Sequence, residues 1–365
     1  MSQPSDNLPP THAPPTHAKR SVHPRVAVAV ALALAATVLA LIAALWVGPA
    51  QLSAAEVVGA IVRKLTGRPA PVPWRDAVVI SLRLPRALVG FVVGGGLGVA
   101  GAALQGLFRN PLAEPGVLGI SSGASLGAVL AIVFRLAGRT VVALPACAFL
   151  GAAIDAVLVF AIAARRGRGR LFTGTLLLVG VAVTALNVSL TTFTLSLALA
   201  SYDVGRQVQF WLLGGLEGRS FDHLLLGGPA VLLGAAVIAA HARDLDALML
   251  GEVAAQSLGV DVPRVRLRLV LAASLVVGAV IAVAGPIAFV GLLVPHIVRL
   301  AIGPRHGALV PLAFLGGGVF LLLADVVARS VMAPAQIPVG VVTAVVGAPV
   351  FLVLLVRRRV EVAGP

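Results

Sequence analysis

The chain has 365 residues, of which 59% are hydrophobic and only 12% are charged. Soluble domains contain roughly half apolar and a quarter charged residues, so this composition excludes a soluble protein and indicates a polytopic membrane protein. The formal charge of +14 comes almost entirely from arginines scattered between apolar runs, which favours topology-setting loops over a nucleic-acid interface. The single Cys147 excludes a disulfide framework and a multi-cysteine metal cluster, so we expect no metal site.

Residues 1–24 are polar and proline-rich and repeat the pentapeptide PPTHA, so they are expected to form a disordered cytoplasmic tail. The first apolar run, Val26 to Val47, is longer than the hydrophobic region of a signal peptide and follows this tail. It is therefore predicted to remain as a membrane anchor. Residues 25–359 are expected to form one transmembrane domain, and 360–365 a short cytoplasmic C-terminal tail.

A helix needs about 20 residues to cross a bilayer, and the apolar runs predict ten such segments. Pro286 and Pro295 interrupt the eighth of them, so its bounds are the hardest to place. Ten crossings put both termini on one side of the membrane. The predicted helices lie near residues 26–48, 87–107, 116–136, 140–163, 172–200, 224–242, 265–284, 286–302, 308–330 and 338–356.

The distribution of Lys and Arg favours a cytoplasmic N-terminus. With that orientation, 17 of the 28 lie in cytoplasmic segments, as the positive-inside rule predicts. The segment between the first two helices is an exception, because it holds six of the other 11. The same segment contains Ser53 and Glu56 in a capping-box pattern, which predicts a short amphipathic helix along the outer surface.

Three patterns bear on nucleotide binding and hydrolysis, and none supports an enzyme. Gly96 to Gly101 matches the dinucleotide fingerprint G-x-G-x-x-G but lies in an apolar helix, without the strand that the fingerprint needs. Gly119 to Gly123 matches the G-x-S-x-G pattern of hydrolases but has no obvious histidine base. Both patterns predict close helix packing instead. Neither Lys19 nor Lys64 stands in a Walker A loop, so the chain itself cannot be a standard P-loop ATPase.

Several longer motifs are more specific, namely Arg83–Arg86 and residues 101–124, 251–260, 285–299, 322–329 and 337–351. Taken together and in this order, they resemble the FecCD family of ABC-importer permeases, which import ferric siderophores, haem and cobalamin. The resemblance implies an all-α, ten-helix type II importer permease domain over residues 25–359, paired with a second copy, two cytoplasmic ATPases and an extracytoplasmic binding protein.

The resemblance also implies a role and a location for the chain. It would line a path for ferric siderophores through the inner (cytoplasmic) membrane, with cobalamin or haem as alternative cargo. Its partner ATPases would use ATP and Mg²⁺, so no cofactor, catalysis or nucleic-acid partner is expected for this chain. An ion-coupled secondary transporter is the competing class, and a membrane enzyme comes third. Asp155 and Asp325 are the acids that a proton path would use, but neither belongs to a chain of titratable groups.

One loop is implied to seat in the ATPase as the family's coupling helix. It is a short run of helix formers, and Gly259 stands where the helix would be capped. A small apolar face suits a groove on a partner, and the alternative is a surface helix that only joins two spans. The assigned residues are Gly251, Glu252, Ala254, Ala255, Leu258 and Gly259.

Three outer arginines, Arg83, Arg86 and Arg329, are implied to receive acidic side chains of the binding protein. Their planar guanidinium groups can each hold a carboxylate by two hydrogen bonds. The alternative is pairing within the chain, above all between Arg329 and Asp325, which stands four residues earlier on the same helical face.

Asn110, Pro111 and Glu114 mark a cytoplasmic turn, where prolines end helices and Asn110 can bond freed backbone. A purely structural role and a role near the ATPase are both compatible with this pattern. By the resemblance, the fifth and tenth helices line the path. The fifth carries polar side chains that could wet a passage, and Thr184, Asn187 and Thr191 are the assigned candidates among Thr184, Asn187, Ser189, Thr191 and Thr192.

Overall fold

The computed structural model describes residues 24–166, 173–198 and 201–362, and within these ranges the chain forms helices and loops without a strand. The all-α class expected from the sequence is confirmed. The elements are α1 (Pro24–Trp46), α2 (Ala54–Thr66), α3 (Pro73–Ala77), the π-helical turn η1 (Val78–Arg83), α4 (Leu84–Phe108), the 3₁₀ turn η2 (Pro115–Leu118), α5 (Ile120–Val133), α6 (Ala143–Arg166), α7 (Thr173–Ala198), α8 (Tyr202–Leu212), α9 (Phe221–Ala240), α10 (Ala242–Met249), α11 (Glu252–Ser257), α12 (Val262–Ala284), α13 (Val290–Ile302), α14 (His306–Ser330) and α15 (Val339–Val362).

Each of the ten predicted spans overlaps one of these helices. In the described part of the chain, seven helices are long and apolar enough to cross a membrane, namely α1, the continuous α3–η1–α4, α6, α7, α9, α12 and α14. The other three predicted spans correspond to shorter apolar helices, α5, α13 and the apolar part of α15. In α5 and α13 the shortening has a visible cause, because irregular segments at 109–119 and 285–289 replace the first turns of the predicted spans.

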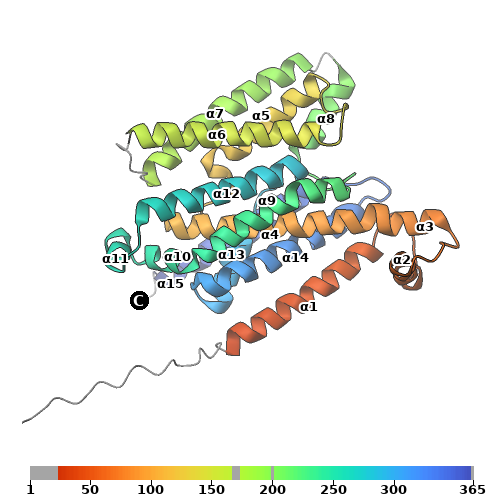
Figure 1. Ribbon diagram of the computed structural model, residues 1–365, viewed down its shortest axis with the longest axis horizontal. Coiled ribbons are helices and arrows are strands. Elements are labelled where there is room, and N and C mark those ends of the chain that lie inside the picture. Colours follow the sequence, from red (N-terminus) through yellow and green to blue (C-terminus); the bar gives the residue numbers. More distant parts are fainter. Residues whose placement is uncertain (1–23, 167–172, 199–200, 363–365) are drawn as a thin grey trace, which may run out of the picture.

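Helices α4 and α12 lie at the centre of the bundle and are almost completely buried (Figure 1). The glycines of α4 allow its neighbours to approach closely. A Cβ at Gly94 would overlap the carbonyl oxygen of Gly317 in α14, and a Cβ at Gly98 would overlap that of Ala313. The glycine pattern that mimics a dinucleotide fingerprint is therefore a helix-packing surface, as expected.

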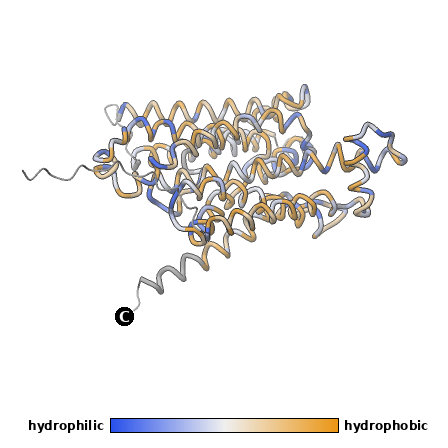
Figure 2. The backbone as a smooth tube through the Cα atoms, turned by 60° about the horizontal axis from the view of Figure 1, so that its bottom comes forward, coloured by the Kyte–Doolittle hydropathy of each residue, from blue (hydrophilic) through white to orange (hydrophobic). Residues whose placement is uncertain are grey.

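The remaining long helices are arranged on two sides of α12. Helices α5, α6 and α7 form one group, whereas α4, α9, α14 and α1 lie on the other side (Figure 1). Gly123 and Gly127 of α5 pack against the backbone of α6, so the hydrolase-like pattern also serves helix packing. Apolar residues extend along the spans, and polar residues gather towards their two ends (Figure 2).

The two ends of the bundle are called here the α2 end and the α11 end. At the α2 end, the predicted capping box is present, since Ser53 Oγ accepts from the Glu56 amide at 3.3 Å and Glu56 accepts from the Ser53 amide at 2.8 Å. Two ion pairs, Arg63–Asp76 and Arg75–Glu56, fasten α2 to α3. Helices α8 and α10, which the sequence analysis did not predict, are short and amphipathic and connect longer helices.

Candidate functional site

The segment predicted as a coupling helix forms α11 at the α11 end (Figure 1). Its flanking glycines, Gly251 and Gly259, both have positive φ angles, of 115° and 84°, and so break the chain on either side of the helix. Ala255 is fully buried and Ala254 half-buried, so the small face expected to contact a partner points largely into the chain.

The exposed apolar face of this segment consists of other residues. Leu250, Val253 and Leu258 are 70%, 79% and 65% exposed. Leu258 was predicted, but Leu250 and Val253 were not. The available signal was the presence of two large apolar side chains, Leu250 and Val253, in a loop between predicted spans. We refer to these three residues as the apolar face of α11.

Glu252 is bonded within the chain. Its carboxylate lies 2.5 Å from the guanidinium of Arg266, whose side chain is buried in the first turns of α12. A carboxylate in the first turn of a helix is also favoured by the helix dipole. Glu252 therefore fixes α11 on the central helix α12.

The turn after α4 lies beside this segment. Arg109 ends α4 in a left-handed conformation, and its guanidinium is 3.8 Å from the position of a Cβ on Gly251. Asn110 Oδ1 accepts from the Leu112 amide at 2.9 Å, which is the backbone-bonding role expected for it, and Pro111 is half-buried. Glu114 behaves differently, because it points away from the turn and accepts from the amide of Phe289 at 3.1 Å.

At the α2 end, Arg83 and Arg329 are buried and bond to the end of α1. Arg83 donates to the carbonyls of Leu45 and Trp46, at 2.8 and 2.7 Å, and to that of Ala50. Arg329 donates to the carbonyls of Ala44 and Val47, at 3.1 and 2.9 Å. The last carbonyls of a helix have no partner within it, so these two cations cap the C-terminus of α1.

Asp325 forms ion pairs with two of the three predicted docking arginines, Arg329 and Arg86. The alternative pairing with Arg329 is present, at 3.0 Å, and Arg86 binds the same carboxylate at 2.8 Å. Arg86 also donates to Gln336 at 2.7 Å. The three predicted docking arginines are thus brought together, but each already has partners in the chain.

A cavity of about 280 Å³ opens beside this cluster and is lined by Arg83, Arg86 and Arg329 together with Glu217 and Arg219. The pKa of Arg219 is lowered to about 10, mainly by burial and also by the nearby positive charge of Arg86, while Glu217 opposes the shift. The cavity is therefore rich in positive charge. Arg219 was missed as a site residue because it lies in a loop far along the sequence from Arg83.

The polar residues predicted on α7 do not share an exposed face. Asn187 is buried and donates to Asp155 of α6 at 2.5 Å and to Ser122 of α5 at 3.2 Å. Thr191 is also buried and Thr184 half-buried. These side chains join α5, α6 and α7. The exposed side of α7 instead carries Ser189, Thr192 and Ser196, at a spacing of three and four residues that sequence reading could have separated.

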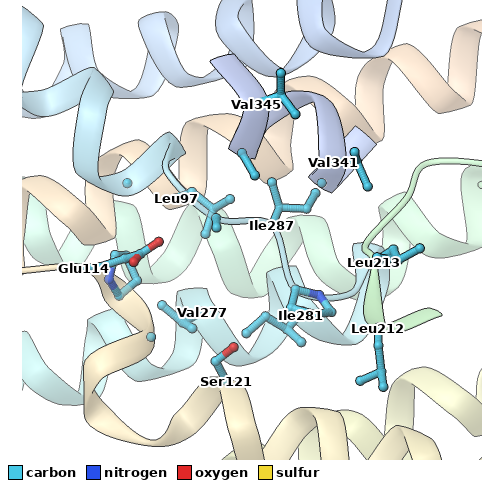
Figure 3. A pocket seen from close by; sticks show the side chains of 17 residues that line it. Leu97, Glu114, Ser121, Leu212, Leu213, Val277, Ile281, Ile287, Val341 and Val345 are labelled. Atoms are coloured by element: carbon cyan, nitrogen blue, oxygen red, sulfur yellow. The ribbon is translucent and has the colours of Figure 1, made fainter. Parts of the chain in front are cut away.

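A second cavity, of about 520 Å³, lies between α12, the segment 285–289 and α15, and it opens partly to the surface, since Leu213 and Val345 in its lining are 45% and 68% exposed. Glu114, Pro115 and Ser121 line one wall, the irregular segment 285–289 forms another, and α15 contributes Val341 and Val345. Figure 3 shows the carboxylate of Glu114 beside the apolar side chains of this cavity. We call it the central cavity.

The sequence is similar to those of known transport proteins. Residues 36–357 match the FecCD transport family. The chain is 45% identical to the cobalamin import system permease of Halobacterium salinarum, over 78% of this chain and 75% of that protein. It is 40% identical to the hemin transport system permease of Yersinia pestis, over 78% and 85%. It is 38% identical to the ferric dicitrate transport system permease of Escherichia coli, over 79% and 92%.

The fold agrees with this relationship. A solved structure of a metal-chelate type ABC transporter in an inward-facing conformation matches 91% of this chain and 99% of its own, with a TM-score of 0.78 and 31% identity. The relatives are permease components of ABC import systems, and the present chain shares their length and helix arrangement. The chain belongs to the FecCD transport family of ABC-importer permeases.

Proposed function

We propose that this permease imports cobalamin through a path between two copies of the chain, driven by two ATPases that bind at the α11 end. The observation that carries the proposal is the apolar face of α11. Val253 on α11 and the flanking Leu250 and Leu258 are exposed large apolar side chains around a short helix that Glu252 holds against α12. Such a surface fits the groove of a partner, since large apolar side chains left in water mark interaction sites.

This proposal places the α11 end in the cytoplasm and the α2 end outside the inner membrane. The charge distribution of the loops supports that orientation, because the arginines near α10, α12 and α13 then lie in the cytoplasm. Both termini are cytoplasmic in this arrangement, as the sequence analysis expects.

At the outer face, the binding protein would dock over the arginine-lined cavity. An incoming carboxylate would meet Arg86 and Arg219 at its mouth, while Arg83 and Arg329 would hold the walls by capping α1. The incoming carboxylate would also reduce the repulsion between Arg219 and the neighbouring arginines. This supports the assignment, since a negative charge is favourable where several cations lie together. Arginine also holds carboxylates in a planar, two-bond geometry.

The path itself would be lined by the exposed side of α7 and by α15. Ser189, Thr192 and Ser196 present hydroxyl groups on the surface of α7 that the rest of the chain leaves open. A second copy of the chain would cover this surface and complete the path. The residues Thr184, Asn187 and Thr191 would then support the wall from behind.

Cobalamin is favoured over a ferric siderophore because the relatives at 45% and 44% identity are both cobalamin permeases. The hemin permease, at 40%, is as similar as two other vitamin B12 permeases, and the ferric dicitrate permease is 38% identical, so the preference rests on the first two relatives. All these cargoes are large metal complexes, so the same path would suit each of them.

The test is uptake in cells that lack this gene. Labelled cyanocobalamin, iron-labelled ferric dicitrate and hemin are supplied side by side, with and without the restored gene. We expect a selective loss of cobalamin uptake that the gene restores, and sensitivity of that uptake to vanadate. Selective loss of iron or hemin uptake would change the cargo and keep the importer. Uptake that resists vanadate and collapses with a protonophore would instead support an ion-coupled transporter.

A further inference from the structure

The two irregular segments inside the bundle meet each other. Segment 109–119 follows α4, and segment 285–289 follows α12. A Cβ on Gly291, the second residue of α13, would lie 2.7 Å from the Pro115 ring, so even a methyl group has no room between segment 109–119 and the start of α13. Gly291 in turn touches α4 at Gly101, seven residues before the end of the helix. Segment 109–119 therefore runs back alongside α4 into the bundle, from the end of the helix to the level of Gly101, a rise of about 10 Å.

Glu114 joins these segments by a hydrogen bond. Its carboxylate accepts from the amide of Phe289, the N-cap residue immediately before α13. Phe289 has a φ angle of 68°, which is strained for an aromatic residue and persists only where the surroundings impose it. The ion pairs formed by the described residues do not include Glu114, so the start of α13, with its helix dipole, is the partner that balances this charge.

A carboxylate inside a membrane protein is expensive to keep and is therefore a functional candidate. A purely structural need would be met by the second contact between these parts, in which the buried Gln105 of α4 donates to the carbonyl of Leu292 at 3.1 Å. Gln105 holds α13 to α4 but does not reach segment 109–119. Glu114 alone among these contacts links α13 to that segment by a hydrogen bond.

The far end of segment 109–119 lies at the coupling helix. Arg109 stands beside Gly251, the residue that precedes α11. The near end, with Glu114 and Pro115, forms a wall of the central cavity opposite the segment 285–289 (Figure 3). Segment 109–119 thus runs from the proposed ATPase contact to the central cavity.

We propose that Glu114 is a positioning residue that transmits a movement of the proposed coupling helix α11 to the wall of the central cavity. A shift of α11 would move Arg109 and its segment, and the Glu114–Phe289 bond would carry the start of α13 with it. This inference rests on the proposed function, since it assumes that an ATPase drives α11. It assigns to Glu114 a task distinct from the cytoplasmic turn formed by Asn110 and Pro111.

The test uses the complete importer, with its ATPase and binding protein, reconstituted in vesicles and supplied with labelled cyanocobalamin. The quantity measured is cargo transported per ATP hydrolysed. Glu114→Ala should lower this ratio about tenfold, because a hydrogen bond to a charged group is lost, while ATP hydrolysis continues. Glu114→Gln should stay within about twofold of the wild type, because its amide oxygen still accepts from Phe289. Leu112→Ala, an exposed position in the same segment, is the matched control.

Hydrogen exchange gives a second readout that does not require transport. Glu114→Ala should speed exchange about tenfold in the peptide that contains Phe289 and leave α9 unchanged. If Glu114→Ala fails to assemble, Gly291→Ala separates the same segments at Pro115 and should lower the transport ratio in the same way.

An unchanged ratio in Glu114→Ala, or a ratio in Glu114→Gln as low as in Glu114→Ala, would overturn the proposal. The second result would mean that the charge itself, and not the bond to Phe289, is needed. If the wild-type importer shows no ATP-dependent uptake, the proposed function fails. Unchanged local exchange in Glu114→Ala would then refute the bond's role independently.

Discussion

The two ends of this permease use charge and apolar surface in opposite ways. At the α2 end, Arg83 and Arg329 are buried and saturated with carbonyl and carboxylate partners. At the α11 end, the apolar face of α11 stands exposed, and the nearby ion pair of Glu252 with Arg266 holds the helix in place. The first arrangement fixes three helices to one another, whereas the second leaves a surface that gains stability only from a partner.

The difference bears on how each end would bind the partner proteins proposed above. A cluster of satisfied buried charges resists rearrangement, because removing any member leaves another charge unpaired. It therefore suits a stiff docking platform. Exposed large apolar side chains on a short helix gain most when a pocket covers them, which suits the transmission of movement from a motor. The predictions below aim at these contrasting properties, in order of expected effect.

The largest effect is expected from Asp325→Ala at the α2 end. This carboxylate is buried and neutralises both Arg86 and Arg329. Its removal would leave two cations without their counter-charge, and breaking a buried pair destabilises a protein by about 3–5 kcal/mol. Thermal unfolding of the purified permease should show a correspondingly large fall in Tm.

Asp222→Ala serves as the control for this variant, because Asp222 is an exposed acid on the same side of the molecule. Its Tm should stay close to that of the wild type. An Asp325→Ala protein as stable as the control would mean that the cluster is not what holds this end together.

The next effect is expected at the α11 end, from Val253→Asp and Leu258→Asp. Each places a charge on the exposed apolar face, and a central apolar contact typically contributes about 2 kcal/mol or more to an interface. Co-purification with the partner ATPase should fall more than about tenfold, while the Tm of the isolated permease stays constant. Gln256→Asp adds the same charge at an exposed polar position of α11 and should have little effect.

The sequence predicts the local structure at both ends well. Each of the ten predicted spans overlaps a helix, and the capping box at Ser53 and the short helix after Gly251 follow from local patterns. Local patterns predict local structure well because the groups that decide it are neighbours in the chain.

What the sequence does not predict is which side of each helix is covered. Asn187 looks like a path residue until its contact with Asp155, 32 positions away, is known. Arg83 looks free to dock until it meets the end of α1, more than 30 positions before it. Ala255, which was expected to face a partner, is buried, whereas Val253, to which no role was assigned, is exposed, because burial depends on tertiary packing.

A smaller effect is expected when a proposed docking arginine, Arg219, is compared with an arginine that caps α1, Arg83. Arg219→Ala should weaken affinity for the binding protein about tenfold without lowering the Tm, because Arg219 lies among other cations. Arg83→Ala should do the reverse, since it exposes the carbonyls that end α1. Titration calorimetry and thermal unfolding of both variants make the comparison.

The pKa of Arg219 gives an internal check on the same contact. Because burial lowers this pKa to about 10, the side chain loses its proton as the pH rises through that value. Affinity for the binding protein should therefore weaken near pH 10 in the wild type more than in Arg219→Ala. Equal pH profiles for the two proteins would remove Arg219 from the docking surface.

The smallest effect is expected from Ser53→Ala, which removes the N-cap of α2. Loss of a Ser cap destabilises a helix by about 1 kcal/mol, so amide exchange in α2 should accelerate about fivefold. The ion pairs with α3 remain, and α2 is not part of the arginine cluster. Binding-protein affinity should therefore stay unchanged. A loss of affinity in Ser53→Ala would show that the docking platform extends from the arginine-lined cavity onto α2, and that stiffness at this end depends on local helix stability as well as on buried charge.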